Sequence, residues 1–132
     1  MSRRPIAQIN IDALQHNFNH IRSIAPQRKV LAVLQANAYG HGLLAVAEQL
    51  KAAGAFGVAR IDEALMLRAG GIVKPIVLLE GFFHPDELPQ IVASNLQVVV
   101  HHRSQVEALL AADLEAPIHV WLKVDSGMHR LG

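Results

Sequence analysis

Residues 75–100 read PIVLLEGFFHPDELPQIVASNLQVVV, and this stretch contains one complete strand–helix–strand unit. An apolar run over Ile76–Leu79 follows Pro75, which is tolerated at the first position of a strand. A helix is predicted to begin near Pro85, because proline favours the first helical turn. A second apolar run, Gln97–Val100, ends the unit. Apolar strands joined by helices indicate a parallel sheet that is covered by helices.

The same alternation continues on both sides of this unit. Helical spacing and turn residues predict further helices, and short apolar runs predict further strands. The further helices are predicted over Asp12–Ser23, Leu43–Leu50, Asp62–Arg68 and 104–112, and the further strands over Val30–Leu34, Ala55–Ala59 and Ile118–Val124. Ser104 and Glu107 form a capping-box pattern at the start of the last helix, and Gly54 marks the predicted end of the helix over 43–50.

The five predicted strands begin near residues 30, 55, 76, 97 and 118, which suits repeats of one strand, one helix and two short loops. This spacing alone does not separate an open doubly wound sheet from a barrel. No GxGxxG follows the first strand, and the glycine-rich segment 39–42 has no phosphate-loop lysine. A nucleotide-binding interpretation therefore lacks its phosphate loop.

Five strands are too few to close the usual eight-stranded barrel. Both outer strands would then present apolar side chains and unpaired backbone groups. We therefore expect the chain to self-associate, to pair with a missing C-terminal segment, or to be a piece of a longer protein.

The amino-acid composition argues against several classes of binding partner. The 132 residues carry a formal net charge of +1, with scattered basic residues and only one Trp and one Tyr, so neither nucleic acid nor a membrane is expected as a partner. The basic start, residues 1–5, is not followed by an apolar run of signal-peptide length. No cysteine is present, which excludes disulfides and suits a reducing compartment. A cytoplasmic location is the default expectation.

Two segments carry the chemistry. Residues 31–42, LAVLQANAYGHG, end the first barrel-type strand, where the loops of such a fold build active sites. Residues 121–132, WLKVDSGMHRLG, end the fifth strand. Both segments resemble the alanine racemase family, which has a lysine at the position of Gln35, followed by the same ANAYGHG, and a similar KVD(T/S)GMxRLG motif. Further similar stretches extend the resemblance over essentially all of this chain, or roughly the first third of a full racemase.

The resemblance implies the N-terminal portion of a pyridoxal 5'-phosphate-binding (β/α)8 barrel that interconverts L- and D-alanine, either to supply D-alanine for the cell wall or in alanine catabolism. In that family the lysine forms a Schiff base with the cofactor and moves a proton on one face of the alanine Cα. A tyrosine of the other subunit serves the opposite face. The resemblance also implies that Tyr39 contacts the cofactor phosphate, that Arg130 hydrogen-bonds the cofactor ring oxygen, and that Lys123 occupies an often carbamylated position that holds Arg130.

Gln35 departs from the family pattern. Its carboxamide nitrogen has no usable lone pair and does not titrate near neutrality, so it can hydrogen-bond the cofactor but cannot attach it or shuttle a proton. We expect this chain, with the remaining barrel strands and the family's β-domain absent, to be a catalytically inactive fragment. Two alternatives stay open, namely a noncatalytic half-barrel that assembles with itself or with a complementary piece, and a non-covalent binder of pyridoxal phosphate or another small phosphate.

Each candidate side chain also has a purely structural interpretation. Tyr39 could pack against the barrel rim, and Arg130 and Lys123 could simply be solvated. His41 is expected to be a loop residue whose ring packs or hydrogen-bonds locally. No metal is expected, because the pairs 101–102 and 16/20 lack a third histidine or carboxylate ligand.

Overall fold

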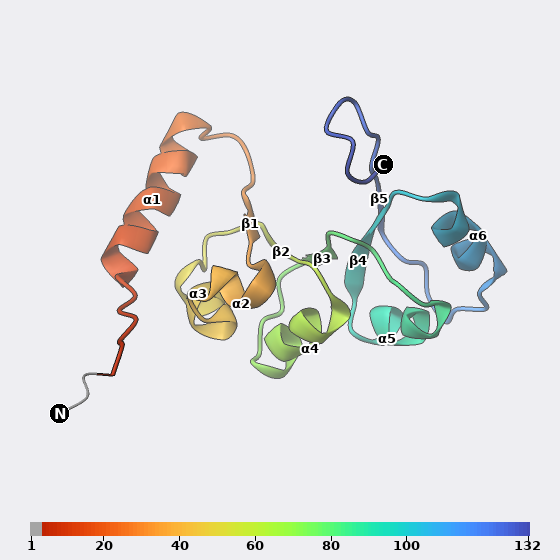
Figure 1. The fold of residues 1–132 in the computed structure, drawn as a ribbon, viewed down its shortest axis with the longest axis horizontal. Coiled ribbons are helices and arrows are strands. Elements are labelled where there is room, and N and C mark those ends of the chain that lie inside the picture. The colour runs from red at the N-terminus through yellow and green to blue at the C-terminus, as the bar shows by residue number, and fades with distance from the viewer. Residues whose placement is uncertain (1–3) are drawn as a thin grey trace.

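The computed structural model describes residues 4–132, so the first three residues of the basic start lie outside the described residues. Its centre is one sheet of five parallel strands in the order β1-β2-β3-β4-β5, with helices in every connection (Figure 1). The strands are β1 (Leu31–Val33), β2 (Ala55–Val58), β3 (Ile76–Leu78), β4 (Leu96–Val100) and β5 (Val120–Leu122). The helices are α1 (Ile11–Ile24), α2 (Gln35–Tyr39), α3 (Leu43–Gln49), α4 (Ile61–Ala69), the 3-10 helix η1 (Pro85–Glu87), α5 (Leu88–Ala93) and α6 (Arg103–Ala111). The predicted alternation of strands and helices is confirmed.

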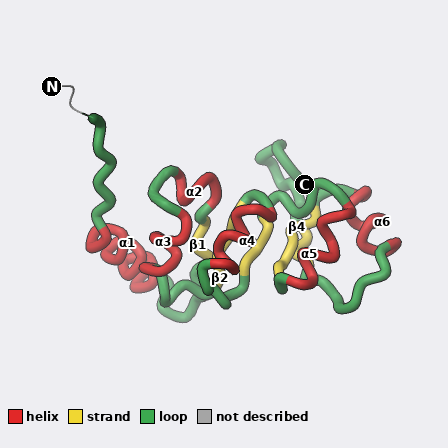
Figure 2. The backbone as a smooth tube through the Cα atoms, turned by 90° about the horizontal axis from the view of Figure 1, so that it is seen from below, coloured by secondary structure: helices red, strands yellow, loops and turns green. Residues whose placement is uncertain are grey.

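The two faces of the sheet have different surroundings, because alternate side chains of a strand point to opposite faces. The side chains that face the helices form the core and are almost completely excluded from solvent: Phe56, Val58, Ile76, Leu78 and Val98 from strands, and Ala64, Leu67, Leu88 and Ile91 from helices. On the other face Val33 and Trp121, in the two outer strands, stay 38% and 48% exposed, whereas Val77 and Val99 of the inner strands are buried. The helices α3, α4 and α5 follow one another along the sheet, with α1 beyond the β1 end (Figure 2). The sheet is not closed, so the architecture is a partial (β/α)8-type barrel.

The sheet has two open edges. Within residues 4–132, neither β1 nor β5 has a strand on its far side. The last strand is also poorly covered, since Val120 and Leu122 in it and Val124 just after it are 43%, 75% and 72% exposed. The open edges expected from the strand count are therefore present. None of the helices in this part of the chain is long and apolar enough to cross a membrane.

Several predicted boundaries differ from the structure by one or two residues, as the last strand and the end of α3 illustrate. The last strand occupies Val120–Leu122 rather than 118–124, because these three residues form the register with β4. The helix α3 ends at Gln49, and Leu50 is its C-cap, so Gly54 does not end it. Gly54 instead precedes β2, where its N–H donates to the Val30 carbonyl at 2.9 Å.

The predicted capping box of Ser104 and Glu107 is also wrong. His102 is the N-cap of α6, and its Nδ1 accepts a hydrogen bond from the Ser104 N–H. Gln105 completes the box, because its Oε1 accepts from the His102 N–H at 3.2 Å. The Gln105 side chain is buried, and its Nε2 donates to two carbonyl groups of the loop after β3. These long-range hydrogen bonds explain why Gln105, and not Glu107, completes the capping box of α6.

At the amino-terminal end of the strands, Arg68 of α4 ties two loops together. Its Nε and Nη2 donate to the carbonyls of Ser94 and Asn95 at 2.8 and 2.9 Å. Its Nη1 donates to the carbonyls of Ile72 and Lys74, both at 2.7 Å. Burial lowers the pKa of Arg68 from its ordinary value, but the guanidinium stays charged. Arg68 thus satisfies four backbone groups at the entrances to β3 and β4.

We expect Arg68→Ala to lower the free energy of unfolding by about 3 kcal/mol, because hydrogen bonds to a charged group contribute more than neutral ones and their loss leaves carbonyls unpaired. Urea denaturation followed by circular dichroism measures the loss. Arg103→Ala is the matched control, since Arg103 is 89% exposed and only pairs with Glu107 on the surface. The control should lose about 0.5 kcal/mol or less. Equal losses in the two variants would contradict the role of Arg68.

Candidate functional site

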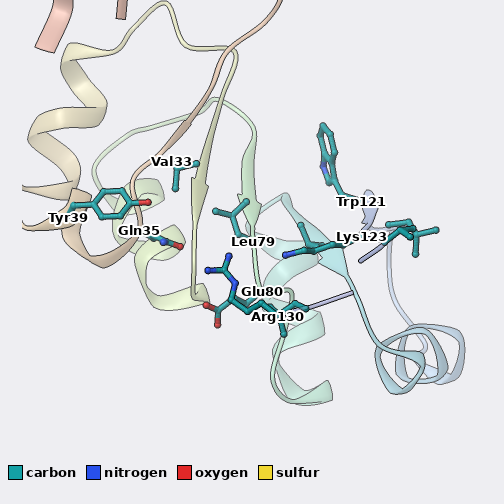
Figure 3. A pocket seen from close by; sticks show the side chains of 12 residues that line it. Val33, Gln35, Tyr39, Leu79, Glu80, Trp121, Lys123 and Arg130 are labelled. Carbon is teal, nitrogen blue, oxygen red and sulfur yellow. The ribbon is translucent and has the colours of Figure 1, made fainter. Parts of the chain in front are cut away.

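A pocket opens at the carboxyl ends of the strands, on the face of the sheet away from the helices. Its volume is about 860 Å³. The lining residues are Val33, Gln35, Tyr39, Leu79, Glu80, Val99, Trp121, Leu122, Lys123, Val124, Arg130 and Leu131. The structure therefore brings together the four residues singled out from the sequence, Gln35, Tyr39, Lys123 and Arg130. Figure 3 shows their side chains around the same space.

The two outer strands deliver most of these groups. Gln35 follows β1 with only Leu34 between them, and Lys123 comes directly after β5. The Lys123 N–H donates to the Val100 carbonyl at 2.9 Å, so the backbone there continues the pairing of β5 with β4. Because the carboxyl ends of parallel strands meet at one edge of the sheet, residues about 90 positions apart in the sequence line one pocket.

Gln35 and Tyr39 flank a turn of unusual handedness. The φ angles of Ala36, Asn37, Ala38 and Tyr39 lie between 53° and 57°, in the left-handed helical region. A non-glycine residue costs roughly 1–2 kcal/mol in this region. Four such residues in succession therefore require tertiary contacts to hold them. The turn was not predicted from the sequence, since alanine gives no signal for it and only Asn37 belongs to a type that is enriched in this region.

Glu63 of α4 supplies those contacts. Its Oε1 accepts from the Asn37 N–H at 3.0 Å, and its Oε2 accepts from the Ala59 N–H at 3.2 Å, just beyond β2. The Asn37 side chain adds a second bond, in which its Oδ1 accepts from the Leu43 N–H at 2.9 Å and so joins the turn to α3. The pocket wall that carries Gln35 and Tyr39 is thereby fixed to α4.

We expect Glu63→Ala to lower the free energy of unfolding by about 2 kcal/mol, because the half-buried Ala59 N–H and the more exposed Asn37 N–H both lose a charged acceptor. The exchange of the Asn37 amide hydrogen should become faster than that of neighbouring amides in α3, as hydrogen-exchange NMR can measure. Asp62→Ala is the control, since Asp62 is an exposed neighbour that pairs only with Arg60 at 3.3 Å. An Asn37 amide that exchanges at the same rate in Glu63→Ala as in the parent would contradict this role.

Asp125 organises the loop that precedes Arg130. Its Oδ1 accepts from the N–H groups of Gly127 and His129 at 2.9 and 3.0 Å, and its Oδ2 lies 3.0 Å from the His129 Nδ1. These bonds, led by the one from the His129 backbone, hold the pKa of Asp125 below its ordinary value, because they favour the charged carboxylate. The turn over 125–129 therefore sets the position of the backbone at Arg130.

The histidines near the pocket have local partners. The His41 Nδ1 lies 2.9 Å from the Ala38 carbonyl, which confirms that His41 is a loop residue bonded locally. The His101 Nε2 lies 3.1 Å from the Glu80 carbonyl, and His102 caps α6. Within residues 4–132, the side chains form no group of three or more histidines and carboxylates that could hold a metal ion.

These features define a class of protein, namely one built on part of a (β/α)8-type barrel, with a pocket at the carboxyl ends of its strands that carries polar and charged side chains between apolar ones. The family described as "Alanine racemase, N-terminal domain" matches residues 9–132. The chain belongs to this family, and the resemblance inferred from residues 31–42 and 121–132 is confirmed.

Individual relatives support the same family assignment. Proteins named alanine racemase from Vibrio atlanticus and Vibrio cholerae are 61% and 59% identical over 126 residues, which are 96% of this chain and 35% of each relative. The crystal structure of biosynthetic alanine racemase from Pseudomonas aeruginosa has a TM-score of 0.88 at 45% identity and covers 92% of this chain and 34% of that one. The structure of alanine racemase from Acinetobacter baumannii has a TM-score of 0.85 at 37% identity. This chain thus spans about 35% of the length of the curated relatives that it matches.

Proposed function

We propose that residues 1–132 form the N-terminal barrel portion of an alanine racemase-type protein, and that this chain binds pyridoxal phosphate without attaching it at position 35 and does not racemise alanine. The parent reaction would be the interconversion of L- and D-alanine. One observation carries the proposal: Gln35 shares a single pocket with Tyr39, Lys123 and Arg130.

The polar side chains of the pocket suit the charge of pyridoxal phosphate. Lys123 and Arg130 bring two positive charges against the one negative charge of Glu80, and the Tyr39 hydroxyl can donate a hydrogen bond to a phosphate oxygen. Leu79 and Trp121 offer apolar surface to the cofactor ring. When bound to a protein, pyridoxal phosphate supplies an electron sink for a carbanion. The chain's own part would be to hold the phosphate and to orient the ring.

Gln35 limits the chemistry at position 35 to hydrogen bonding. A carboxamide can donate and accept hydrogen bonds, so it can contact a ligand in the pocket. It does not capture an aldehyde, and it has no proton to exchange near neutral pH. Proton transfer at the alanine Cα from this side of the pocket would then have no group to carry it at position 35. The proposed loss of racemisation rests on this single substitution.

A second candidate function is a noncatalytic module that assembles with another polypeptide, a second copy of this chain being one option. The open edges of β1 and β5 and the exposed Val120, Leu122 and Val124 favour it, because unpaired strand edges and apolar side chains promote association. Analytical ultracentrifugation tests it. A stable monomer at high concentration would contradict association of the chain with itself.

Binding can be followed directly, because the sole tryptophan of the sequence, Trp121, lines the pocket. We expect pyridoxal phosphate to quench its fluorescence saturably. Arg130→Ala should weaken binding on the order of tenfold through the loss of a charge-assisted hydrogen bond, whereas Arg103→Ala, on the surface of α6, should leave it unchanged. Chiral chromatography should find no D-alanine formed from L-alanine above a blank.

The outcomes separate the candidates. No saturable quenching by a folded chain would overturn the cofactor site and favour the assembly module. Formation of D-alanine above the blank would overturn the proposed inactivity, whatever the affinity for pyridoxal phosphate.

A further inference from the structure

The pocket that contains Gln35 retains one lysine side chain. The lysines of this sequence are Lys29, Lys51, Lys74 and Lys123. Of these, Lys123 alone lines the pocket, where it is half-buried. Figure 3 shows its side chain directed toward the space that Gln35 and Arg130 also face. The pocket therefore holds the kind of nucleophile that Gln35 cannot provide, on the opposite wall.

The strand geometry places this amine on the pocket side of the sheet. Trp121 pairs with Val99, and both line the pocket. Lys123 lies two residues after Trp121, and side chains two residues apart on a strand share a face. The backbone bond from the Lys123 N–H to the Val100 carbonyl keeps the strand conformation to this point. The Lys123 side chain thus starts from a well-defined position.

We propose that Lys123 is the residue at which this chain captures pyridoxal phosphate, or a similar aldehyde with an anionic group, in a reversible covalent bond. The inference rests on the binding site proposed above. The uncharged Nζ attacks the aldehyde carbon with its lone pair, and a carbon–nitrogen bond forms. The carbonyl oxygen leaves as one water molecule that carries the two protons of the amine. The product has a carbon–nitrogen double bond, and no oxidant or reductant is consumed.

Binding in the pocket makes Lys123 differ from the other lysines. Arg130 and Tyr39 can hold the anionic group beside it, so that the aldehyde reacts at a raised effective concentration. Lys74 is also half-buried, but it precedes β3 at the opposite end of the sheet. Glu48 and Lys51 lie around Lys74, and the guanidinium of Arg68 there is bonded to four backbone carbonyls, including that of Lys74 itself. Lys74 is therefore a control within the same molecule.

The experiment traps the bond and locates it. The folded chain is mixed with pyridoxal phosphate in buffer depleted of bicarbonate, reduced with borohydride, digested and mapped by mass spectrometry. We expect labelling of Lys123 to exceed that of Lys74 on the order of tenfold or more at limiting pyridoxal phosphate. Lys123→Arg removes the primary amine, so it should lose the trapped label, whereas Lys74→Arg, outside the pocket, should keep both the label on Lys123 and the saturable quenching of Trp121. Circular dichroism and urea denaturation establish that both variants fold.

The possible labelling results test the capture by Lys123 separately from the proposed binding function. Selective labelling of Lys123 that disappears in Lys123→Arg supports the proposal. Saturable binding with labelling spread evenly over the four lysines, or with no labelling, overturns capture by Lys123 and leaves the proposed binding function intact. Absence of saturable binding overturns the proposed function itself, and any labelling then reflects random surface reaction.

Discussion

Gln35→Lys, made in a Lys123→Arg background, is expected to change the chain from one that leaves no covalent trace of pyridoxal phosphate to one that is labelled almost stoichiometrically at position 35. The physical reason is the lone pair, which is delocalised in a carboxamide and free in an uncharged primary amine. Position 35 lines the same pocket as Tyr39 and Arg130, so the aldehyde would be held next to the new amine. Borohydride reduction followed by peptide mapping measures the effect.

The control for this variant is Gln90→Lys in the same background. Gln90 is exposed on α5, and its side chain donates to the Ser94 hydroxyl at 2.8 Å, away from the pocket. A lysine there should be labelled no faster than Lys74. If position 35 and position 90 were labelled equally, the pocket would not be a site for the cofactor, and Gln35 would not be the reason for the lack of attachment.

Gly81→Ala is expected to be the most destabilising single substitution discussed here, with a loss of about 4 kcal/mol in the free energy of unfolding. A Cβ on Gly81 would lie 2.3 Å from the Val99 carbonyl oxygen and 2.6 Å from the Gln105 Nε2, and the φ angle of Gly81 is +76°. Neither of these neighbours can move away at a small cost in free energy. The carbonyl belongs to β4, and Gln105 is buried with hydrogen bonds to the N–H groups of both His101 and His102.

Gly71→Ala separates the two causes of this loss. Gly71 has a similar φ angle of +86°, but a Cβ there would meet nothing within 4 Å. The control should therefore lose only the roughly 1 kcal/mol of a left-handed alanine. Urea denaturation of both variants gives the difference. A loss at Gly81 no greater than that at Gly71 would mean that the contact with Gln105 and Val99 relaxes freely.

The sequence predicts the strand and helix alternation well, because it depends on local spacing of apolar residues. The prediction fails where a contact with a residue distant in the sequence determines the local structure. The start of α6 is set by Gln105, whose buried amide bonds to carbonyls more than 20 residues away, so Glu107 is not the capping partner. The left-handed turn over 36–39 depends on Glu63, which lies 26 residues after Asn37. Neither contact leaves a local pattern.

The candidate site was accessible from the sequence only in part. The motif around Gln35 and the one around Arg130 indicated the residues, and the parallel order of the strands indicated a common edge. The apolar members of the pocket, such as Trp121 and Leu79, were not singled out, because apolar side chains of a strand give no sign of which face they occupy. Register decides this, and register is a property of strand pairing.

The left-handed backbone of residues 36–39 also predicts the order in which parts of the protein fold. A left-handed turn of non-glycine residues is unfavourable by itself. We therefore expect this turn to form only after α4 has docked and Glu63 can accept the hydrogen bond from the Asn37 N–H. On a ribosome that event must wait until at least 26 further residues have emerged. The wall that carries Gln35 and Tyr39 should thus be a late-forming part of the molecule, and pulse-labelled hydrogen exchange during refolding should find the Asn37 amide protected no earlier than that of Ala59.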